Sequence, residues 1–272
     1  MTILQPGGAD RTPIEVLPWP DFLTWWTSAW EPGQHVGVIG PTGSGKTTKV
    51  LALCSTTDYV LAIDPKGGDR TLAASGWRRV TRWPLPAGVI ADIKDGKPVR
   101  LIVGKIAKTR SLRTANRRLL AQVMPALWEH GGWTVIIDEL QMLTDRRFFN
   151  LADDTVELLI AARDRAISVV TALQRVSVGQ TTGGASSTVG DQVTWLAVSY
   201  TRDDRMVQRL AELLGRPVGE VRDIITALPL HAWAVVGRDP REPIRVTRPP
   251  KLSVPQTGRV VPHVTWREKL FG

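Results

Sequence analysis

The sequence predicts an α/β fold, built on a mainly parallel sheet with helices on both faces. Three observations lead to this prediction. Short runs rich in valine and isoleucine alternate with longer helix-like stretches from residue 35 onward. A glycine-rich loop separates the first of these runs from the first helix, and a later run ends in two adjacent acids. In a parallel sheet, such a loop and such acids meet at the edge formed by the carboxyl ends of the strands.

Composition restricts the class of protein. The chain has 272 residues, 43% of them hydrophobic and 22% charged, which is typical of a folded globular protein. No apolar run reaches the roughly 20 residues that span a bilayer, so no direct membrane insertion is expected. The N-terminal stretch lacks the features of a secretory signal, which favours the cytoplasm. The single cysteine, Cys54, allows no internal disulfide, and the four histidines are scattered.

Charge points to a class of partner. The chain carries 35 Lys and Arg against 26 Asp and Glu, a formal net charge of +9. An excess of this size favours a polyanion, and nucleic acid before a membrane surface. Solubility alone would also explain it.

The N-terminal segment, residues 1–34, is rich in tryptophan. After a loose leader, a helix is expected over residues 18–30 because its aromatic side chains recur at helical spacing, and Asp21 is a candidate cap. The aromatic residues concerned are Phe22, Trp25, Trp26 and Trp30. We expect this segment to pack on the core or on a neighbouring subunit.

Residues 35–236 carry the alternating pattern of one α/β domain. The expected strands are 36–39, 59–63, 99–103, 134–137, 167–172, 194–199 and 232–236. The expected helices are 46–54, 111–130, 153–165 and 203–214. Residues 237–272 are rich in proline and arginine and are expected to form a basic arm, opening with a short hairpin at most.

The strongest motif is a phosphate-binding loop between a strand and a helix. Residues 40–47, GPTGSGKT, fit the pattern G-x-x-x-x-G-K-[ST] completely. Two glycines, Gly43 and Gly45, let the backbone wrap around phosphate oxygens at the positive end of a helix. Lys46 is expected on the β- and γ-phosphates and Thr47 on Mg²⁺. We therefore expect ATP and Mg²⁺ to bind at Gly40, Pro41, Thr42, Gly43, Ser44, Gly45, Lys46, Thr47 and Thr48.

Two adjacent acids end the strand at 134–137. Asp138 is expected beside the loop as the second metal-holding residue. Glu139 is expected to orient and polarise a water molecule for attack on the γ-phosphate, which implies hydrolysis. The alternative is that Glu139 only begins a solvated helix. Asp64 competes with Asp138, but turn residues follow it and no second acid adjoins it, so Asp138 is preferred.

A further strand is predicted within residues 166–177, AISVVTALQRVS, which end in polar residues. In P-loop ATPases that have a separate catalytic glutamate, an extra strand lies between the Walker A and Walker B strands. Gln174 is then the expected γ-phosphate sensor, with Thr171 as the weaker candidate. A polar residue that simply leaves a strand is the alternative.

Together these segments resemble the FtsK/HerA superfamily of DNA-pumping ATPases. The resemblance rests on GPTGSGKTT, VLAIDPKGGD, VIIDEL and AARDRAISVVTALQRVS, and it covers roughly residues 35–236. It implies a RecA-like motor domain in a hexameric ring that translocates double-stranded DNA. The family's Gln-Arg-Pro-Ser is Gln174-Arg175-Val176-Ser177 here.

The other domains of FtsK-type proteins do not fit in this length. The resemblance therefore implies a bare motor of phage, plasmid or integrative-element origin, in a bacterial or phage-infected cell. A separate targeting or membrane partner is expected.

The resemblance also implies that an arginine of one subunit completes the ATP site of the next. Arg163 and Arg165, before the sensor strand, are the first candidates; salt bridges to nearby acids are the alternative. The reserve candidates are Arg202, Arg205, Arg146 and Arg147.

Two segments are candidates for DNA contact. Arg110, Arg113 and Arg117 are spaced three and four residues apart, on one helix face that would bind phosphates without reading sequence. Residues 178–190 offer hydroxyls and movable glycines, with Thr181, Thr182 and Ser186 as the DNA-facing candidates. A solvated helix face and a disordered surface loop are the alternatives.

The leading functional hypothesis is therefore a double-stranded DNA translocase acting in DNA transfer, segregation or packaging. A single-strand helicase or a secretion or packaging ATPase on the same core is the second. The third is an ATP-switched DNA-binding module that does not pump, although the lysine that usually begins the loop of partitioning switches is absent here, where Gly40 and Pro41 stand.

Overall fold

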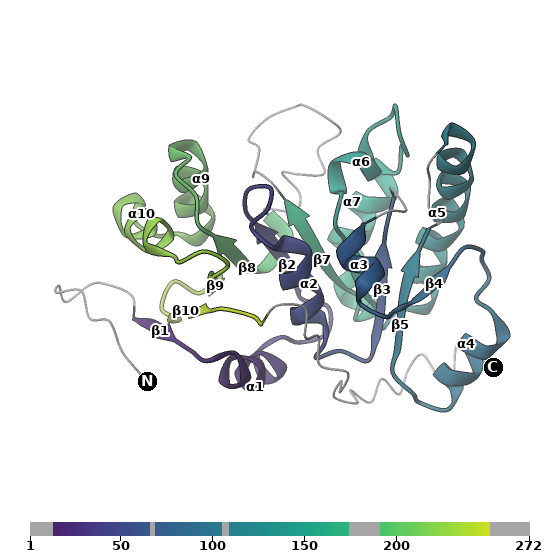
Figure 1. The fold of residues 1–272 in the computed structure, drawn as a ribbon, viewed down its shortest axis with the longest axis horizontal. Coiled ribbons are helices and arrows are strands. Elements are labelled where there is room, and N and C mark those ends of the chain that lie inside the picture. The colour runs from purple at the N-terminus through teal and green to yellow at the C-terminus, as the bar shows by residue number, and fades with distance from the viewer. Residues whose placement is uncertain (1–12, 66–68, 105–108, 174–190, 251–272) are drawn as a thin grey trace.

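A single large sheet organises the molecule. The computed structural model describes residues 13–65, 69–104, 109–173 and 191–250. These residues form a ten-stranded sheet in the order β1-β10-β9-β8-β2-β7-β6-β3-β5-β4, with helices on both faces (Figure 1). Only β9 runs against its neighbours, antiparallel to both β8 and β10. The predicted mainly parallel α/β fold is confirmed.

The elements alternate along the chain as the sequence pattern indicates. The strands are β1 (Ile14–Val16), β2 (His35–Ile39), β3 (Tyr59–Ile63), β4 (Arg78–Val80), β5 (Val99–Val103), β6 (Thr134–Ile137), β7 (Ser168–Leu173), β8 (Val193–Ser199), β9 (Trp233–Gly237) and β10 (Ile244–Thr247). The helices are α1 (Trp19–Ala29), α2 (Lys46–Cys54), α3 (Arg70–Ala74), α4 (Ala87–Lys94), α5 (Arg110–His130), α6 (Leu140–Thr144), α7 (Ala152–Ala161), the 3-10 turn η1 (Ala162–Arg165), α9 (Asp204–Leu214) and α10 (Val218–Ala227).

The strand that leads into the phosphate-binding loop lies at the centre. β2 pairs in parallel with β7 on one side and with β8 on the other. β7 in turn pairs with β6, the strand that the two acids follow. β7 is therefore an extra strand between β2 and β6. All five residues of β2 are buried, as expected of a strand covered on both faces.

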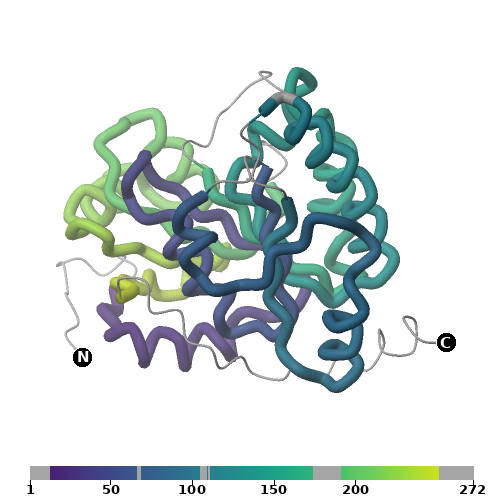
Figure 2. Tube along the Cα trace, turned by 45° about the vertical axis from the view of Figure 1, so that its right-hand side comes forward, coloured from purple at the N-terminus to yellow at the C-terminus, as the bar shows by residue number. Residues whose placement is uncertain are grey.

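Two apolar layers cover the sheet. One contains α1, α2 and α3, and its largest fully buried side chains include Trp26 and Phe22. The other contains α4, α5, α6, α7, α9 and α10. In Figure 2 the purple N-terminal helix lies at the lower left and the teal helices lie at the right. No helix of the described part of the chain is both long and apolar enough to cross a bilayer.

The flanking segments belong to the same sheet. Phe22 and Trp26 of α1 are buried against this chain's own core. β1 pairs in parallel with β10, so strands from both flanks extend the sheet beyond residues 35–236. Asp21 is not the cap, and that prediction is wrong: the N-cap is Pro18, which places Asp21 inside the first turn.

The helix expected over 153–165 ends earlier. α7 stops at Ala161 and the chain continues as η1, which Ala166 closes with a left-handed φ of 54°. This left-handed residue turns the chain into β7, so the helical pattern breaks before the strand begins.

Candidate nucleotide site

The phosphate-binding loop has the backbone that its sequence requires. Gly43 and Gly45 have φ angles of 82° and 88°, in the region that glycine adopts without strain. Gly45 is also the N-cap residue of α2, so the loop passes directly into a helix N-terminus. Gly40 is constrained by a close approach, because a Cβ there would lie 2.2 Å from the Ser199 hydroxyl.

Thr47 connects the loop to the acid-bearing strand. Its Oγ1 donates a hydrogen bond to Oδ2 of Asp138 over 3.0 Å. Thr47 stands in the first turn of α2, and Asp138 follows the last residue of β6. The two motifs are 91 residues apart in sequence, and the parallel strands bring them to one edge of the sheet.

A cavity of about 340 Å³ lies at this edge, within the range of sites for small ligands. Asp138, Glu139, Asp69, Ala172 and Leu173 contribute to its wall. From the predicted binding set, its lining includes Thr42, Gly43, Gly45, Lys46, Thr47 and Thr48. A second cavity, of about 390 Å³, shares both acids of the motif and Asp69 with the first.

Lys46 lies across the loop. Its Nζ donates to the carbonyl oxygens of Gly40 and Pro41, over 2.9 Å each. Burial lowers the pKa of the Lys46 amine, and the nearby carboxylates of Asp138 and Glu139 oppose that shift. The remaining predicted binding residue, Ser44, is a buried residue of the loop itself.

The acids of the site act on one another. Burial raises the pKa of Asp138 to about 6, Asp69 and Glu139 add to the rise, and the hydrogen bond from Thr47 and the charge of Lys46 oppose it. Glu139 is the N-cap residue of α6, without a side-chain capping bond, and it lines both cavities. Asp69, the N-cap residue of α3, was not among the predicted site residues, although it closes the stretch VLAIDPKGGD that follows from β3.

Asp64, the competing candidate, has another partner. Its Oδ2 accepts from Nη2 of Arg79 over 3.0 Å, and Nη1 of the same guanidinium donates to the carbonyl oxygen of Gly104. The side chain of Asp64 is 3% exposed. Its carboxylate therefore holds the end of β3 to the β4–β5 edge of the sheet.

The oxygen atoms at this edge fit a magnesium ion. The described residues hold no cluster of three or more histidine, cysteine or acidic side chains arranged for a metal. Mg²⁺ does not need such a cluster, because it takes one or two protein oxygens and completes its shell with water and phosphate. The Thr47 hydroxyl and the Asp138 carboxylate, 3.0 Å apart, form such a partial set.

Several predicted residues lie outside the described part of the chain. Gln174, Thr181, Thr182 and Ser186 are among them. The weaker sensor candidate, Thr171, is buried within β7 with no hydrogen-bond partner for its hydroxyl among the described residues. Arg110 begins α5, and Arg113 and Arg117 on the same helix are exposed. No described residue forms an ion pair with Arg113 or Arg117.

The candidate trans arginines occupy different edges. Arg163 and Arg165 lie in η1, which precedes β7 and therefore stands at the edge opposite the loop. Arg163 is exposed, and the Arg165 guanidinium lies 5.6 Å from the centre of the Trp128 ring. The described residues form no ion pair with either, so the salt bridges of the alternative interpretation are not seen there.

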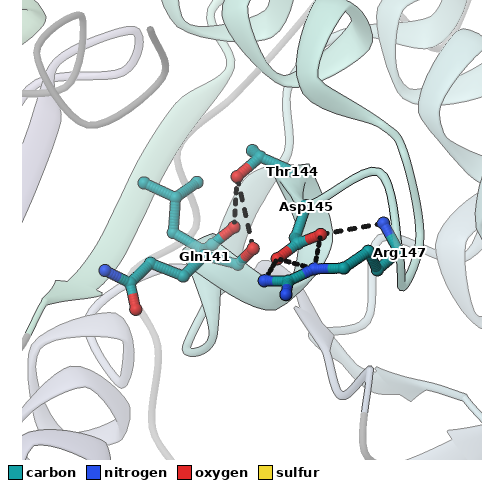
Figure 3. A network of polar contacts seen from close by, with 5 residues as sticks. Gln141, Thr144, Asp145 and Arg147 are labelled. Atoms are coloured by element: carbon teal, nitrogen blue, oxygen red, sulfur yellow. Dashed lines mark hydrogen bonds and ion pairs between the residues drawn. The ribbon is translucent and has the colours of Figure 1, made fainter. Parts of the chain in front are cut away.

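The reserve candidates follow strands or helices at the loop edge. Arg202 follows β8, and its guanidinium lies 5.7 Å from the Tyr200 ring centre. Arg147 forms a local ion pair, because its guanidinium donates to the Asp145 carboxylate over 2.7 Å (Figure 3). The same figure shows Thr144 bonded to the backbone of α6, which fixes the turn after Glu139.

No protein-family model matches the chain, and no curated protein matches its sequence. Solved structures match its fold. The genome packaging NTPase B204 from Sulfolobus turreted icosahedral virus 2, in complex with AMPPCP, has a TM-score of 0.53 at 15% identity, over 81% of this chain and 100% of that chain. VirB4 of Thermoanaerobacter pseudethanolicus has a TM-score of 0.54 at 10% identity, over 80% and 89%.

B204 from Sulfolobus Turreted Icosahedral Virus, described as a DNA-packaging ATPase, has a TM-score of 0.52 at 16% identity, over 82% and 100% of the two chains. At such identities the likeness concerns the fold alone. The chain therefore shares the mixed α/β fold of these P-loop NTPases.

Proposed function

We propose that this chain is an ATP hydrolase that uses Mg²⁺. The observation that carries the proposal is the 3.0 Å hydrogen bond from Thr47 to Asp138, which joins a complete phosphate-binding loop to an acid-ended strand. Glu139 adjoins this pair in the wall of the same cavity. A carboxylate in that position suits attack by water rather than transfer to a second substrate.

Each residue has a separate role in this proposal. The amides of the loop and Lys46 bind the phosphates, and Thr47 and Asp138 hold Mg²⁺, which offsets negative charge on the phosphate oxygens. Glu139 orients the attacking water and accepts its proton. The solvent-poor wall formed by Ala172 and Leu173 strengthens these electrostatic interactions.

Two substitutions test the hydrolase. Lys46→Ala should lose ATP turnover, and Glu139→Gln should still bind ATP while its turnover falls about 100-fold or more, since a general base contributes that much. Steady-state phosphate release and binding of a labelled ATP analogue measure the two effects. Lys94→Ala and Glu129→Gln, exposed residues on other helices, are the matched controls. Turnover by Glu139→Gln at the wild-type rate would remove Glu139 from this role.

We further propose that the hydrolase moves double-stranded DNA as a ring-shaped oligomer. The net charge of +9 supports a polyanionic partner, as do Arg113 and Arg117, which are exposed and form no ion pair with a described residue. Neighbours in fold are named as genome-packaging enzymes, which is consistent with such a substrate. The secretion or helicase alternative shares the same core and differs in what it moves.

DNA stimulation of ATP turnover separates these alternatives. Duplex DNA should raise the rate more than single-stranded DNA, and its affinity should fall steeply with salt because bound phosphates release counterions. Arg113→Gln with Arg117→Gln should weaken that affinity and flatten the salt slope. Arg222→Gln with Arg241→Gln removes the same charge from exposed arginines elsewhere and serves as the control. An ATPase that no DNA stimulates would favour a substrate other than DNA.

A further inference from the structure

His231 contacts the phosphate-binding loop from a distant part of the chain. It stands between α10 and the start of β9, where the antiparallel direction of β9 brings it to the loop edge of the sheet. Its Nδ1 lies 3.3 Å from the carbonyl oxygen of Ser44, across 187 residues of sequence. A carbonyl oxygen only accepts hydrogen bonds, so this contact requires a proton on Nδ1.

The contact fixes the direction of one peptide group. In a planar trans peptide the carbonyl and the following amide point to opposite sides. If the Ser44 carbonyl faces His231, the N–H of Gly45 faces away from His231. Gly45 is in the wall of the cavity, whereas Ser44 is buried, 8% exposed, and is not among the residues that line it. The amide is therefore turned toward the side where phosphate would bind.

This peptide needs an external restraint. Gly45 has a φ of 88° and no side chain, so its backbone has access to conformations in which the carbonyl would face the cavity instead. A carbonyl oxygen there would repel phosphate. His231 itself has a φ of 63°, a left-handed conformation that costs energy for a non-glycine residue. His231, whose backbone is strained, thus contacts a peptide group whose glycine would otherwise let it rotate.

We propose that His231 is a positioning residue that holds the Ser44–Gly45 peptide with its amide toward the phosphates. The inference rests on the proposed nucleotide site. It adds that a residue outside every motif determines how well the loop binds a nucleoside diphosphate or triphosphate. His231 does not touch the nucleotide in this role, because it acts through the backbone.

The tautomer of His231 tests the geometry without nucleotide. Nitrogen-15 NMR of the imidazoles in the full chain distinguishes a proton on Nδ1 from one on Nε2, and comparison with His231→Asn identifies the signal among the four histidines. We expect His231 to carry its proton on Nδ1. A neutral ring with the proton on Nε2 would overturn the proposal.

Binding of Mg²⁺-ADP, measured by calorimetry, tests the consequence. His231→Leu should weaken ADP about five- to tenfold, as the loss of one hydrogen bond predicts. His231→Asn should restore binding, because its amide nitrogen replaces Nδ1 and asparagine tolerates a left-handed φ. His231→Gly relieves the strain without supplying a donor, and should bind as weakly as His231→Leu. The neighbouring Leu230→Ala, at a side chain that is 71% exposed, is the control.

The outcomes separate the two proposals. Unchanged ADP affinity in His231→Leu, or wild-type affinity in His231→Gly, would overturn the positioning role. A wild-type chain that binds no Mg²⁺-ADP would overturn the proposed function instead, and the tautomer would still report whether the His231 contact exists.

Discussion

His35, the first residue of β2, is a neutral imidazole inside the sheet. Its Nε2 donates to the carbonyl oxygen of Leu159 and its Nδ1 accepts from the amide of Val169, both over 3.0 Å. These bonds join β2, α7 and β7 below the phosphate-binding loop. Burial lowers the pKa of His35 to about 4; the bond to Leu159 opposes the shift and the charge of Arg163 adds to it.

The stability of the protein should therefore fall in mild acid. The unfolded chain binds a proton at His35 near pH 6.5 and the folded chain only near pH 4, so the contribution is present above pH 6.5 and is lost as the pH falls toward 4. Between pH 7 and pH 5 this residue should cost about 2 kcal/mol of unfolding free energy. Urea unfolding at the two pH values measures the loss.

His35→Gln should have a smaller difference between the two pH values, even if its stability at pH 7 is lower. His130→Gln, which changes a histidine outside this network, should keep the wild-type difference. Equal pH dependence in wild type and His35→Gln would assign the acid sensitivity to other groups.

Residues of the site were predictable where their motif is contiguous. The loop at 40–47 and the acid pair at 138–139 are each recognised from neighbouring letters, because backbone wrapping and strand ends impose local spacing. Asp69, Ser199 and His231 reach the site through tertiary structure, and nothing in their local sequence distinguishes them from ordinary polar residues.

At the scale of elements, a buried lysine of the loop helix α2 packs against the aromatic rings of α1. Lys49 is fully buried, and its Nζ lies 4.4 Å from the Phe22 ring centre and 4.9 Å from that of Trp19. The described residues offer this nitrogen no hydrogen-bond partner. Burial lowers the pKa of the Lys49 amine well below 10.5. The contact of the two helices therefore includes an amine that is better solvated in the unfolded chain.

Lys49→Met should stabilise the protein. Methionine keeps the length and apolar character of the stem and removes the unsatisfied amine, which we expect to raise the unfolding free energy by about 1–3 kcal/mol. The gain should shrink as the pH rises toward 10.5, because the unfolded chain then releases the same proton. Lys94→Met, at an exposed position on α4, should leave urea unfolding nearly unchanged. A destabilised Lys49→Met would mean that the aromatic rings stabilise the amine more than burial penalises it.

Some elements were predicted to the residue, as for α2 at 46–54 and β3 at 59–63. The helices α3, α4 and α10 and the strands β1 and β4 were not predicted. β4 has three residues and pairs only at the sheet edge, and β1 depends on its pairing with β10, so neither carries enough local pattern to stand out. Their positions depend on which backbone groups the neighbouring edge strand leaves free for pairing. The local sequence of β1 or β4 does not contain that information.

At the scale of the whole molecule, the first trans-arginine candidates lie at the sheet edge opposite the phosphate-binding loop of their own chain. Arg163 and Arg165 precede β7, and the loop follows the parallel strand β2. An interface that uses them must bring the sheet edge opposite the loop in one chain against the loop edge of the next chain. Arg202 and Arg205, after β8, would instead need two loop edges to meet.

Mixing variants distinguishes the arrangements. If sites are shared in a ring, the Arg163→Ala, Arg165→Ala chain and the Lys46→Ala chain should each lose ATP turnover and regain part of it when combined, since some interfaces then hold an intact half from each. The Arg202→Ala, Arg205→Ala chain tests the reserve pair in the same assay. Full activity of both arginine variants alone, or an active monomer at high dilution, would contradict a shared site.

The pairing of β2 also dictates an order of assembly during synthesis. Val36 pairs with Val170 and with Trp195, so the strand that leads into the loop leaves the ribosome long before either neighbour. At about 5–20 residues per second, it waits roughly 7 to 30 seconds for β7. Meanwhile β3 and β5, only 40 residues apart at Tyr59 and Val99, are free to pair. A nascent chain stopped before β8 would carry the whole loop motif without one of the two strands that flank β2, so we expect it to bind nucleotide only once β8 has been synthesised.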